Sequence, residues 1–213
     1  MLEFSGQGLS CFRGGRVVFA GLSFHLEAGD ALVLHGQNGS GKSSLLRIVA
    51  GLLLPIEGEI RWSDANSTIE DEPDIHHNRT QYVGHADIIK PVMSVWENIA
   101  FWSQLRTPEP EVMGALSAFG LKHLAHVPGQ FLSAGQKRRV NLARILAAPA
   151  NLWLLDEPAS ALDIDATSLL VEAIANHRKK GGIVIVSTHQ DLALSKCQTL
   201  LLDDFTVENS DDV

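Results

Sequence analysis

The chain has 213 residues, of which 17 are basic and 25 are acidic, and its formal net charge is −8. This balance argues against nucleic acid as the main partner, because phosphate backbones are bound by clustered Lys and Arg. The length and a hydrophobic content of 45% suit one domain, or one core with an inserted lobe. The first residues lack the pattern of a secretory signal, and no apolar run approaches the ~20 residues of a membrane helix, so we expect a cytosolic chain that does not itself span a membrane.

Strand and helix patterns alternate along the first 80 residues. Apolar residues at helical spacing from 43 to 53 predict a helix that Pro55 and Gly58 end. Residues 63–80 are polar and lack a period, so they are predicted to form an exposed loop. The pair His76–His77 lies there without further ligands nearby, which argues against a metal site. Alternating and β-branched residues predict strands at 17–19, 22–26, 31–35 and 59–62.

From residue 92 to about 148 the pattern is mostly helical. Ser94 and Glu97 have the spacing of a capping box, and Pro108 and Pro110 break the helix that they open. The basic run 137–139 is interpreted as a solvated helix face. Further helices are predicted at 111–119, 133–147 and 165–180, and strands at 81–84, 151–155 and 183–187. Apolar strands that alternate with helices predict a parallel sheet covered on both faces.

A glycine-rich segment stands between a predicted strand and a predicted helix, and it matches the pattern G-x-x-x-x-G-K-[ST] of phosphate-binding loops. Glycines let backbone N–H groups turn toward a phosphate oxygen, and the following helix presents its positive end to the same anion. Lys42 supplies a charge for the β- and γ-phosphates, and the Ser43 hydroxyl can ligate Mg²⁺. We therefore predict that the chain binds ATP with magnesium and hydrolyses it, through Gly36, Gln37, Asn38, Gly39, Ser40, Gly41, Lys42 and Ser43.

Two carboxylates follow the apolar run from 152 to 155. Adjacent side chains diverge at the end of a strand, so the two acids can have separate roles. Asp156 is predicted to approach Mg²⁺ together with Ser43. Glu157 is predicted to accept a hydrogen bond from the attacking water and to act as the general base. The alternative, a solvated pair at a strand end, does not account for the phosphate loop upstream.

The most specific motif lies in the helical region and reads Leu132-Ser133-Ala134-Gly135-Gln136. It resembles the LSGGQ signature of the ATP-binding-cassette (ABC) ATPases, with Ala134 in place of the first glycine, and the resemblance covers nearly the whole chain. Ser133 occupies an N-cap position, so its helix would present free N–H groups to an anion. In the family that anion is the γ-phosphate held by the other subunit, which implies a head-to-tail homodimer with two ATP molecules at its interface.

The resemblance also implies a fold and a division of the chain. The fold is that of an α/β P-loop NTPase, with a RecA-like parallel sheet core, an N-terminal antiparallel β region and an inserted helical lobe. The whole chain, 1–213, would be one ABC ATPase domain. Its nucleotide-binding core is expected to comprise 1–85 and 149–213, and its helical subdomain 86–148.

Three further positions match motifs of the family. Asp163 closes a segment that resembles the D-loop, which crosses the dimer interface. His189 follows the last predicted strand and resembles the switch histidine, which contacts the γ-phosphate and helps to hold the water and Glu157. The resemblance therefore implies Glu157, His189 and Lys42 as catalytic residues. Ser44 resembles the residue that contacts the α-phosphate.

Two positions depart from the family's pattern. After the strand at 81–84 the family has a glutamine that contacts Mg²⁺ and couples to the transporter, and here His85 stands at that Q-loop position. Gln81 precedes the strand and is rejected as its substitute, and a protonated His85 would be a poor magnesium ligand. An aromatic residue normally stacks on adenine. Arg13 aligns with it and Phe12 lies beside it, and since a guanidinium can also stack, both stay candidates.

The Tyr-Val-Gly-His sequence at 82–85 and the signature variant are similar to those of the ATPase subunits of bacterial cytochrome c maturation systems, a branch of the family linked to haem export. That similarity implies integral membrane partners and a peripheral position on the cytoplasmic face of the inner membrane. ATP hydrolysis would drive release of a haem-loaded chaperone, and no residue suggests direct haem contact. The alternatives are the ATPase of another small-molecule exporter, a catalytically inactive scaffold, and a soluble cassette protein that acts on nucleic acid, which the acidic balance disfavours.

Overall fold

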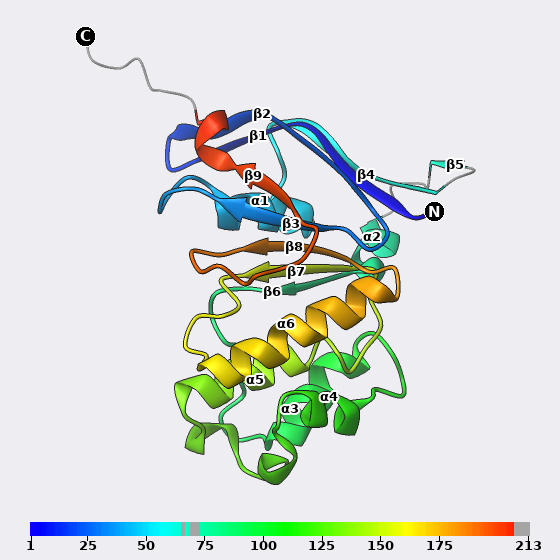
Figure 1. Cartoon of the computed structure of the whole chain (residues 1–213), viewed down its shortest axis with the longest axis vertical. Coiled ribbons are helices and arrows are strands. Elements are labelled where there is room, and N and C mark those ends of the chain that lie inside the picture. Colours follow the sequence, from blue (N-terminus) through cyan, green and yellow to red (C-terminus); the bar gives the residue numbers. More distant parts are fainter. Residues whose placement is uncertain (65–66, 69–72, 207–213) are drawn as a thin grey trace.

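Two β-sheets and a helical lobe make up the part of the chain that the computed structural model describes, residues 1–64, 67–68 and 73–206. Figure 1 shows the antiparallel sheet at one end of the molecule and the helical lobe at the other, with the parallel sheet between them. The predicted architecture of a parallel core, an N-terminal antiparallel region and a helical lobe is therefore confirmed.

The antiparallel sheet has the strand order β2-β1-β4-β5. Its long strands alternate between buried and exposed side chains over much of their length, because one face packs on the core and the other faces solvent. Phe4, Leu22 and Leu26 are fully buried on that inner face. The strands are β1 (Glu3–Arg13), β2 (Arg16–Glu27), β4 (Glu57–Asp64) and β5 (Ser67–Thr68).

The parallel sheet has the order β6-β7-β8-β3-β9. Residues of β7 alternate between two cores: Leu152 and Leu154 pack with α1 and the antiparallel sheet, whereas Trp153 and Leu155 pack with α6 and the helical lobe. Both faces of the sheet are thus covered, which is why every residue of β7 and β8 is buried. The strands are β3 (Ala31–His35), β6 (Thr80–Val83), β7 (Leu152–Asp156), β8 (Ile183–Ser187) and β9 (Gln198–Leu201).

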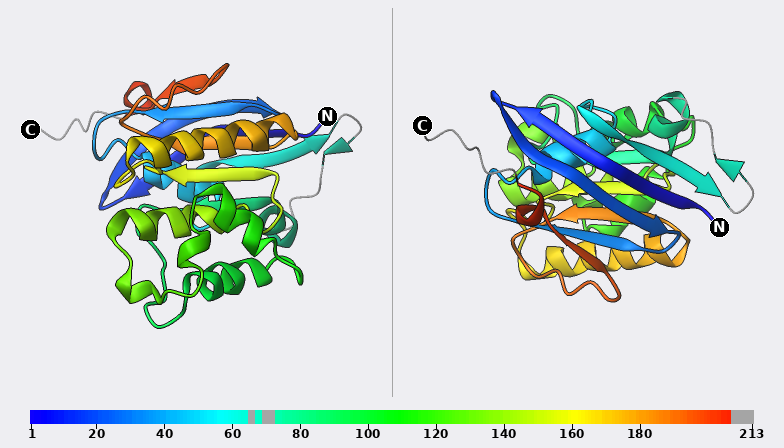
Figure 2. Two further views of the ribbon diagram at one scale, coloured as in Figure 1. Left: turned by 60° about the horizontal axis from the view of Figure 1, so that its bottom comes forward. Right: turned by 90° about the horizontal axis from the view of Figure 1, so that it is seen from above.

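The helices divide into those that flank the parallel sheet and those of the lobe. In Figure 2 the long helix α6 runs alongside the strands of the parallel sheet. The capping box predicted at the start of α3 is confirmed, since Glu97 N–H donates to Ser94 Oγ at 3.2 Å and Ser94 N–H donates to Glu97 Oε2 at 2.7 Å. The α-helices are α1 (Lys42–Val49), α2 (Pro73–Arg79), α3 (Val95–Gln104), α4 (Val112–Ala118), α5 (Ala134–Ala143) and α6 (Ile164–Lys179), and the 3₁₀ turns are η1 (Lys122–Leu124), η2 (Gly129–Phe131) and η3 (Leu202–Phe205).

The prediction of an exposed loop at 63–80 is wrong for most of its described residues; 65–66 and 69–72 lie outside the described part. Strand β4 continues to Asp64, and α2 begins at Pro73, a residue suited to the first helical position. Trp62 Nε1 donates to His76 Nδ1 at 3.0 Å, and His76 Nε2 donates to Val49 O at 2.8 Å. These tertiary contacts fasten a seven-residue helix that has no periodic signal of its own.

Two helices end several residues earlier than predicted, and two elements lie outside the predictions. Helix α1 ends at Val49, before Pro55 and Gly58, because Gly51 adopts a left-handed φ of 71° that terminates the helix. Helix α5 ends at Ala143 rather than at 147. Strand β9 and the turn η3 were not predicted after Ser187, although Leu200 and Leu202 are buried there.

The interpretation of 137–139 as a solvated helix face is wrong. Arg138 is 1% exposed and ranks among the largest fully buried side chains, and Lys137 and Arg139 are half-buried. Helical spacing places Arg138 on the same inward face of α5 as Asn141 and Leu142, which are also buried.

Candidate active site

The phosphate loop connects β3 to α1, as its sequence context predicts. Gly36 has a φ of 146° and Gly41 a φ of 105°, conformations that favour glycine. A Cβ at Gly41 would lie 2.8 Å from the side chains of Phe19 and Val18, and one at Gly36 would lie 2.5 Å from Ser40 Oγ. The backbone therefore needs glycine at both positions to curl against the antiparallel sheet.

The Lys42 side chain folds into the curl of the loop. It is 8% exposed, and its Nζ donates to Gly36 O at 2.7 Å and to Gln37 O at 3.1 Å. Asp203, in η3, braces the same segment, because its carboxylate accepts from Gln37 N–H at 3.2 and 3.3 Å. The ammonium group is thus held among the loop residues that would surround a phosphate.

Ser43 and Asp156 face each other across the end of the parallel sheet. Ser43 Oγ donates to Asp156 Oδ1 at 3.1 Å, although 113 positions separate the two residues. Ser187 Oγ donates to the same carboxylate oxygen at 2.7 Å, and Tyr82 OH donates to Asp156 Oδ2 at 3.4 Å. This set of buried and partly buried oxygen atoms fits the preference of a small divalent cation for hard ligands. Burial raises the pKa of Tyr82, and the negative charge of Asp156 raises it further.

Glu157 has a φ of 47°, in the left-handed region that a non-glycine residue rarely adopts. Its N–H donates to the backbone oxygen and to Oγ of Ser187, each at 3.1 Å. Its Oε1 is buried and lacks a hydrogen-bond partner within the described structure, and His189 Nε2 lies 3.5 Å from it. His189 N–H donates to Glu157 Oε2 at 3.3 Å, while His189 Nε2 donates to Asn38 Oδ1 at 3.0 Å. Such outlying backbone conformations concentrate at functional sites.

One cavity of about 750 Å³ unites these groups. It brings together five phosphate-loop residues, the acidic pair, His189 and His85. Arg13 lines this cavity. Phe12 is 51% exposed but is not among the described residues that line it. The lining residues are Arg13, Gly14, Arg16, Val18, Asn38, Gly39, Gly41, Lys42, Ser43, Ser44, His85, Asp156, Glu157, Ser160 and His189.

Sequence reasoning missed several contributors to this cavity. Arg16 and Val18 lie on β2 and reach it only because the antiparallel sheet folds over the phosphate loop. Ser187, the last residue of β8, contacts both acids of the pair but carries no motif. Rejecting Gln81 as the Q-loop residue agrees with its position, since its Nε2 donates to Ala148 O at 2.9 Å inside the core.

The signature residues 132–136 lie apart from this cavity, and none of them is among the described residues that line it. Ser133 caps α5 as predicted, because its Oγ accepts from Gln136 N–H at 3.2 Å and Gln136 Oε1 accepts from Ser133 N–H at 2.9 Å. A Cβ at Gly135 would lie 2.9 Å from Ala161 O, so the signature packs closely against the segment of Asp163. Asp163 itself caps α6, with Oδ1 accepting from Ala166 N–H at 2.8 Å.

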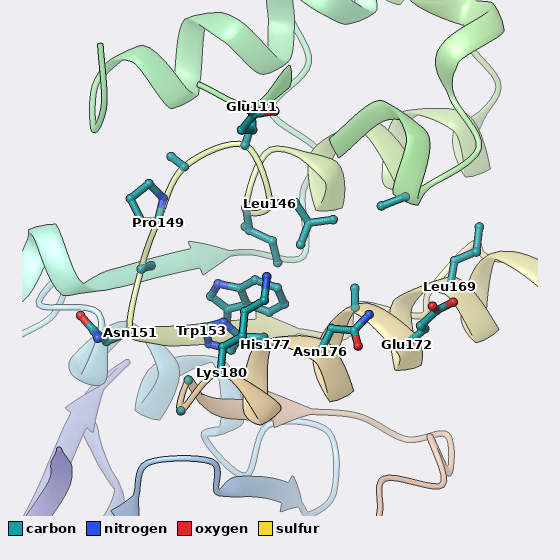
Figure 3. Close-up of a pocket in the computed structure, with 18 of the residues that line it drawn as sticks. Glu111, Leu146, Pro149, Asn151, Trp153, Leu169, Glu172, Asn176, His177 and Lys180 are labelled. Atoms are coloured by element: carbon teal, nitrogen blue, oxygen red, sulfur yellow. The ribbon is translucent and has the colours of Figure 1, made fainter. Parts of the chain in front are cut away.

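A second cavity, of about 560 Å³, opens near the start of β7. Figure 3 shows Trp153 and His177 together at its centre, between Leu146 and Lys180. The two rings stack with centroids 3.8 Å apart. Three carboxylates and one lysine line this cavity, a charge balance that repels phosphates, so the nucleotide is assigned to the first cavity. These charged residues are Glu109, Glu111, Glu172 and Lys180.

His177 makes the fold sensitive to acid. Burial, with a smaller effect of Lys180, lowers its pKa from 6.5 to about 4. As the pH falls below ~6.5, the unfolded chain takes up a proton that the folded chain does not, so the free energy of unfolding should decrease until pH ~4. Between pH 7.5 and pH 5 this loss should be about 2 kcal/mol, at ~1.4 kcal/mol per pKa unit.

Urea denaturation at the two pH values measures this effect. His177→Gln should remove most of the loss, and His126→Gln, at an exposed histidine, should leave it in place. An equal pH dependence in wild type and His177→Gln would contradict the role of His177.

A family model described as ABC transporter matches residues 19–160. The chain belongs to the ABC transporter family. It is an ABC ATPase, with ATP as its nucleotide. A protein named cytochrome c biogenesis ATP-binding export protein CcmA, from Paramagnetospirillum magneticum, is 54% identical over 209 residues, which cover 96% of this chain and 95% of the relative. A protein of the same name from Rhodospirillum rubrum is 53% identical over 208 residues, covering 97% of this chain and 88% of the relative.

Solved structures share the fold of this ABC ATPase. A putative ABC transporter ATP-binding protein from Pyrococcus furiosus superposes with a TM-score of 0.81 at 26% identity, covering 96% of this chain and all of the other. A second structure, the ATP-binding subunit of an ABC transporter, has a TM-score of 0.79 at 21% identity and covers 93% of this chain and 85% of the other. Among the described residues, no helix combines the length and apolarity that crossing a membrane requires.

Proposed function

We propose that this ABC ATPase is the ATP-hydrolysing subunit of a membrane complex for haem export in cytochrome c maturation. The observation that carries the proposal is the 54% identity, along 96% of the chain, to a relative named as a cytochrome c biogenesis export protein. The phosphate-loop, acidic and histidine residues that line one cavity support an active rather than a scaffolding subunit.

The chain's own residues would divide the reaction between them. Lys42 and the loop N–H groups bind the phosphates of ATP, and Ser44 contacts the α-phosphate. Ser43 and Asp156 would hold Mg²⁺, whose charge would offset that of the β- and γ-phosphates. Glu157, whose Oε1 has no partner within the described structure, accepts the hydrogen bond and then the proton of the attacking water. His189, 3.5 Å from that oxygen, holds the carboxylate in place.

The signature would act on a second copy of the chain. Ser133 is exposed, and the N-terminus of α5 that it caps lies outside the nucleotide cavity of its own chain. A head-to-tail homodimer would bring this helix terminus to the γ-phosphate held by the partner's phosphate loop. Asp163 would lie at the same interface, since its segment packs against Gly135.

Two positions that depart from the family receive roles within the cavity. Arg13 lines it and Phe12 does not, so the Arg13 guanidinium would stack on adenine. His85 is exposed, lines the cavity and begins the connection from β6 to the helical lobe. His85 would therefore couple the state of the bound nucleotide to the membrane subunits.

The complex would place this chain peripherally on the cytoplasmic face of the inner membrane, bound to integral membrane subunits. Nucleic acid is not a partner in this proposal, because the chain carries a net charge of −8. Haem would be handled by the other subunits and the chaperone, without direct contact to this chain.

Deletion of the chain from its host, followed by complementation, tests the proposal. Loss of covalently bound haem from c-type cytochromes, restored by the wild-type chain but not by Glu157→Gln, is the expected result. Purification of the tagged chain from solubilised membranes should also recover integral membrane proteins. Normal cytochromes in the deletion strain would redirect the proposal to another small-molecule exporter, and recovery as a lone soluble monomer would contradict it.

A further inference from the structure

Arg138 is a buried charge without a role in the reaction described above. Its side chain is 2% exposed, and it lies in α5, five residues after Ser133. A buried guanidinium is costly unless its N–H groups are paired, so its acceptors indicate why the position is charged. Its described acceptors belong to two segments, 156–158 and 84–87.

The first segment is the turn that carries Glu157. Arg138 Nη2 donates to Asp156 O at 2.9 Å and to Glu157 O at 2.7 Å, and Nε donates to Pro158 O at 3.1 Å. Three consecutive carbonyls are therefore held by one guanidinium, at the place where Glu157 adopts its left-handed conformation. An unfavourable backbone conformation persists only where its surroundings enforce it.

The second segment is the loop that carries His85. Arg138 Nη1 donates to Gly84 O at 2.9 Å, to His85 O at 3.5 Å and to Asp87 Oδ1 at 3.2 Å. Asp87 also accepts from Asn141 Nδ2 at 3.2 Å, which ties this loop to the next turn of α5. The loop is exposed, yet its backbone is anchored to a buried group.

We propose that Arg138 is a positioning residue that couples the His85 loop to the Glu157 turn. The guanidinium is planar and rigid, so a displacement of the acceptors on one edge shifts those on the other. A movement of the His85 loop would thereby change the position of the Glu157 carboxylate, and a movement of α5 would change both. This inference rests on the proposed function, because it takes Glu157 as the general base.

The test compares Arg138→Lys with Arg139→Lys in the full chain, co-purified with its membrane subunits. Arg139 is the adjacent residue of α5, and its guanidinium contacts Phe119 O at 3.5 Å, away from both loops. Arg138→Lys keeps the charge but cannot bridge the two segments. It should lower kcat by about tenfold or more, because a displacement of ~1 Å can cost about 100-fold. ATP affinity, measured without magnesium, should stay within about threefold of wild type, and Arg139→Lys should match wild type in both.

Hydrogen exchange separates coupling from a merely structural role. In Arg138→Lys, backbone amides of both 84–87 and 156–159 should exchange faster, while those of the phosphate loop should not change. Asp87→Asn preserves the shape of the side chain and one accepting oxygen but removes the negative charge that pairs with Arg138, so it should lower kcat in the same direction by a smaller factor. Asp87→Asn also tests the inference if Arg138→Lys fails to fold.

Three results would overturn the inference: an unchanged kcat per folded molecule in Arg138→Lys with only a lower Tm, faster exchange in one of the two segments alone, or wild-type kcat in Asp87→Asn. These results can be distinguished from a failure of the proposed function. If the proposed function were wrong, the wild-type complex would not hydrolyse ATP, and Glu157→Gln would not change its activity.

Discussion

Replacing Glu157 with Gln is expected to lower kcat for ATP hydrolysis by about 100- to 10,000-fold, the contribution typical of a positioned general base. The amide keeps the size of the side chain and can still accept the hydrogen bond of water, but it cannot take up the proton. ATP affinity should stay within about threefold of wild type, because the proposed phosphate ligands, the loop of Lys42 and Ser44, are unchanged. Single-turnover kinetics and equilibrium nucleotide binding measure the two quantities.

Glu172→Gln is the matched control for this variant. Glu172 lines the second cavity, remote from the nucleotide, and the same change of charge there should leave kcat unchanged. A kcat for Glu157→Gln within a factor of about two of wild type would contradict the assignment of Glu157 as the general base. Loss of ATP binding would instead show that the variant disturbs the turn that Arg138 holds.

The sequence sufficed for those parts of the site that depend on local pattern. A phosphate loop between an apolar strand and a helix is recognisable because its glycines, lysine and serine are contiguous. The acidic pair is recognisable because Asp156 and Glu157 end a wholly apolar strand. That Ser43 Oγ lies 3.1 Å from Asp156 follows from the topology, since the phosphate loop follows the carboxyl end of β3 and Asp156 ends β7, and both strands belong to one parallel sheet.

The remaining parts depend on contacts between distant segments. Arg138 was interpreted as solvated because charge patterns do not reveal that backbone carbonyls of two loops surround it. Asp203 contacts Gln37 across 166 positions, and the segment that follows the last motif carries no sequence signal of that contact. Helix α2 has no signal in its own sequence, because the contacts that stabilise it join its residue His76 to Trp62 and Val49. In each case the determining interaction is tertiary.

The proposed head-to-tail dimer leads to a prediction about Ser133. Ser133→Asp is expected to abolish hydrolysis, because it would place a carboxylate against the γ-phosphate of the other subunit. Aspartate caps helices as well as serine does, so α5 and its capping interaction with Gln136 N–H should persist. Ser133→Asn is the matched control, since it also caps but is neutral, and it should retain most of the activity. Steady-state ATPase assays and thermal unfolding distinguish loss of catalysis from loss of fold.

Mixing two inactive variants then tests where the signature acts. Lys42→Ala disables the phosphate loop and keeps the signature, whereas Ser133→Asp disables the signature and keeps the loop. In a head-to-tail dimer, one chain of each kind forms one site from an intact loop and an intact signature. Equal amounts of the two should therefore restore up to about a quarter of the wild-type sites, since half of randomly paired dimers are mixed and one of their two sites is intact.

Recovery of activity on mixing requires that a phosphate loop and a signature from two different chains form one site. Ser133 lies outside the cavity that Lys42 lines, so a signature acting within its own chain would require the helical lobe to move onto the loop. If the signature acted within its own chain, every chain in the mixture would still contain one defective motif. The mixture would then stay as inactive as its components. Recovery on mixing, with none in Lys42→Ala mixed with Glu157→Gln, would show that the two halves come from different chains. In that control pair the only intact phosphate loop lies beside the altered Glu157, so neither site of the mixed dimer can hydrolyse ATP.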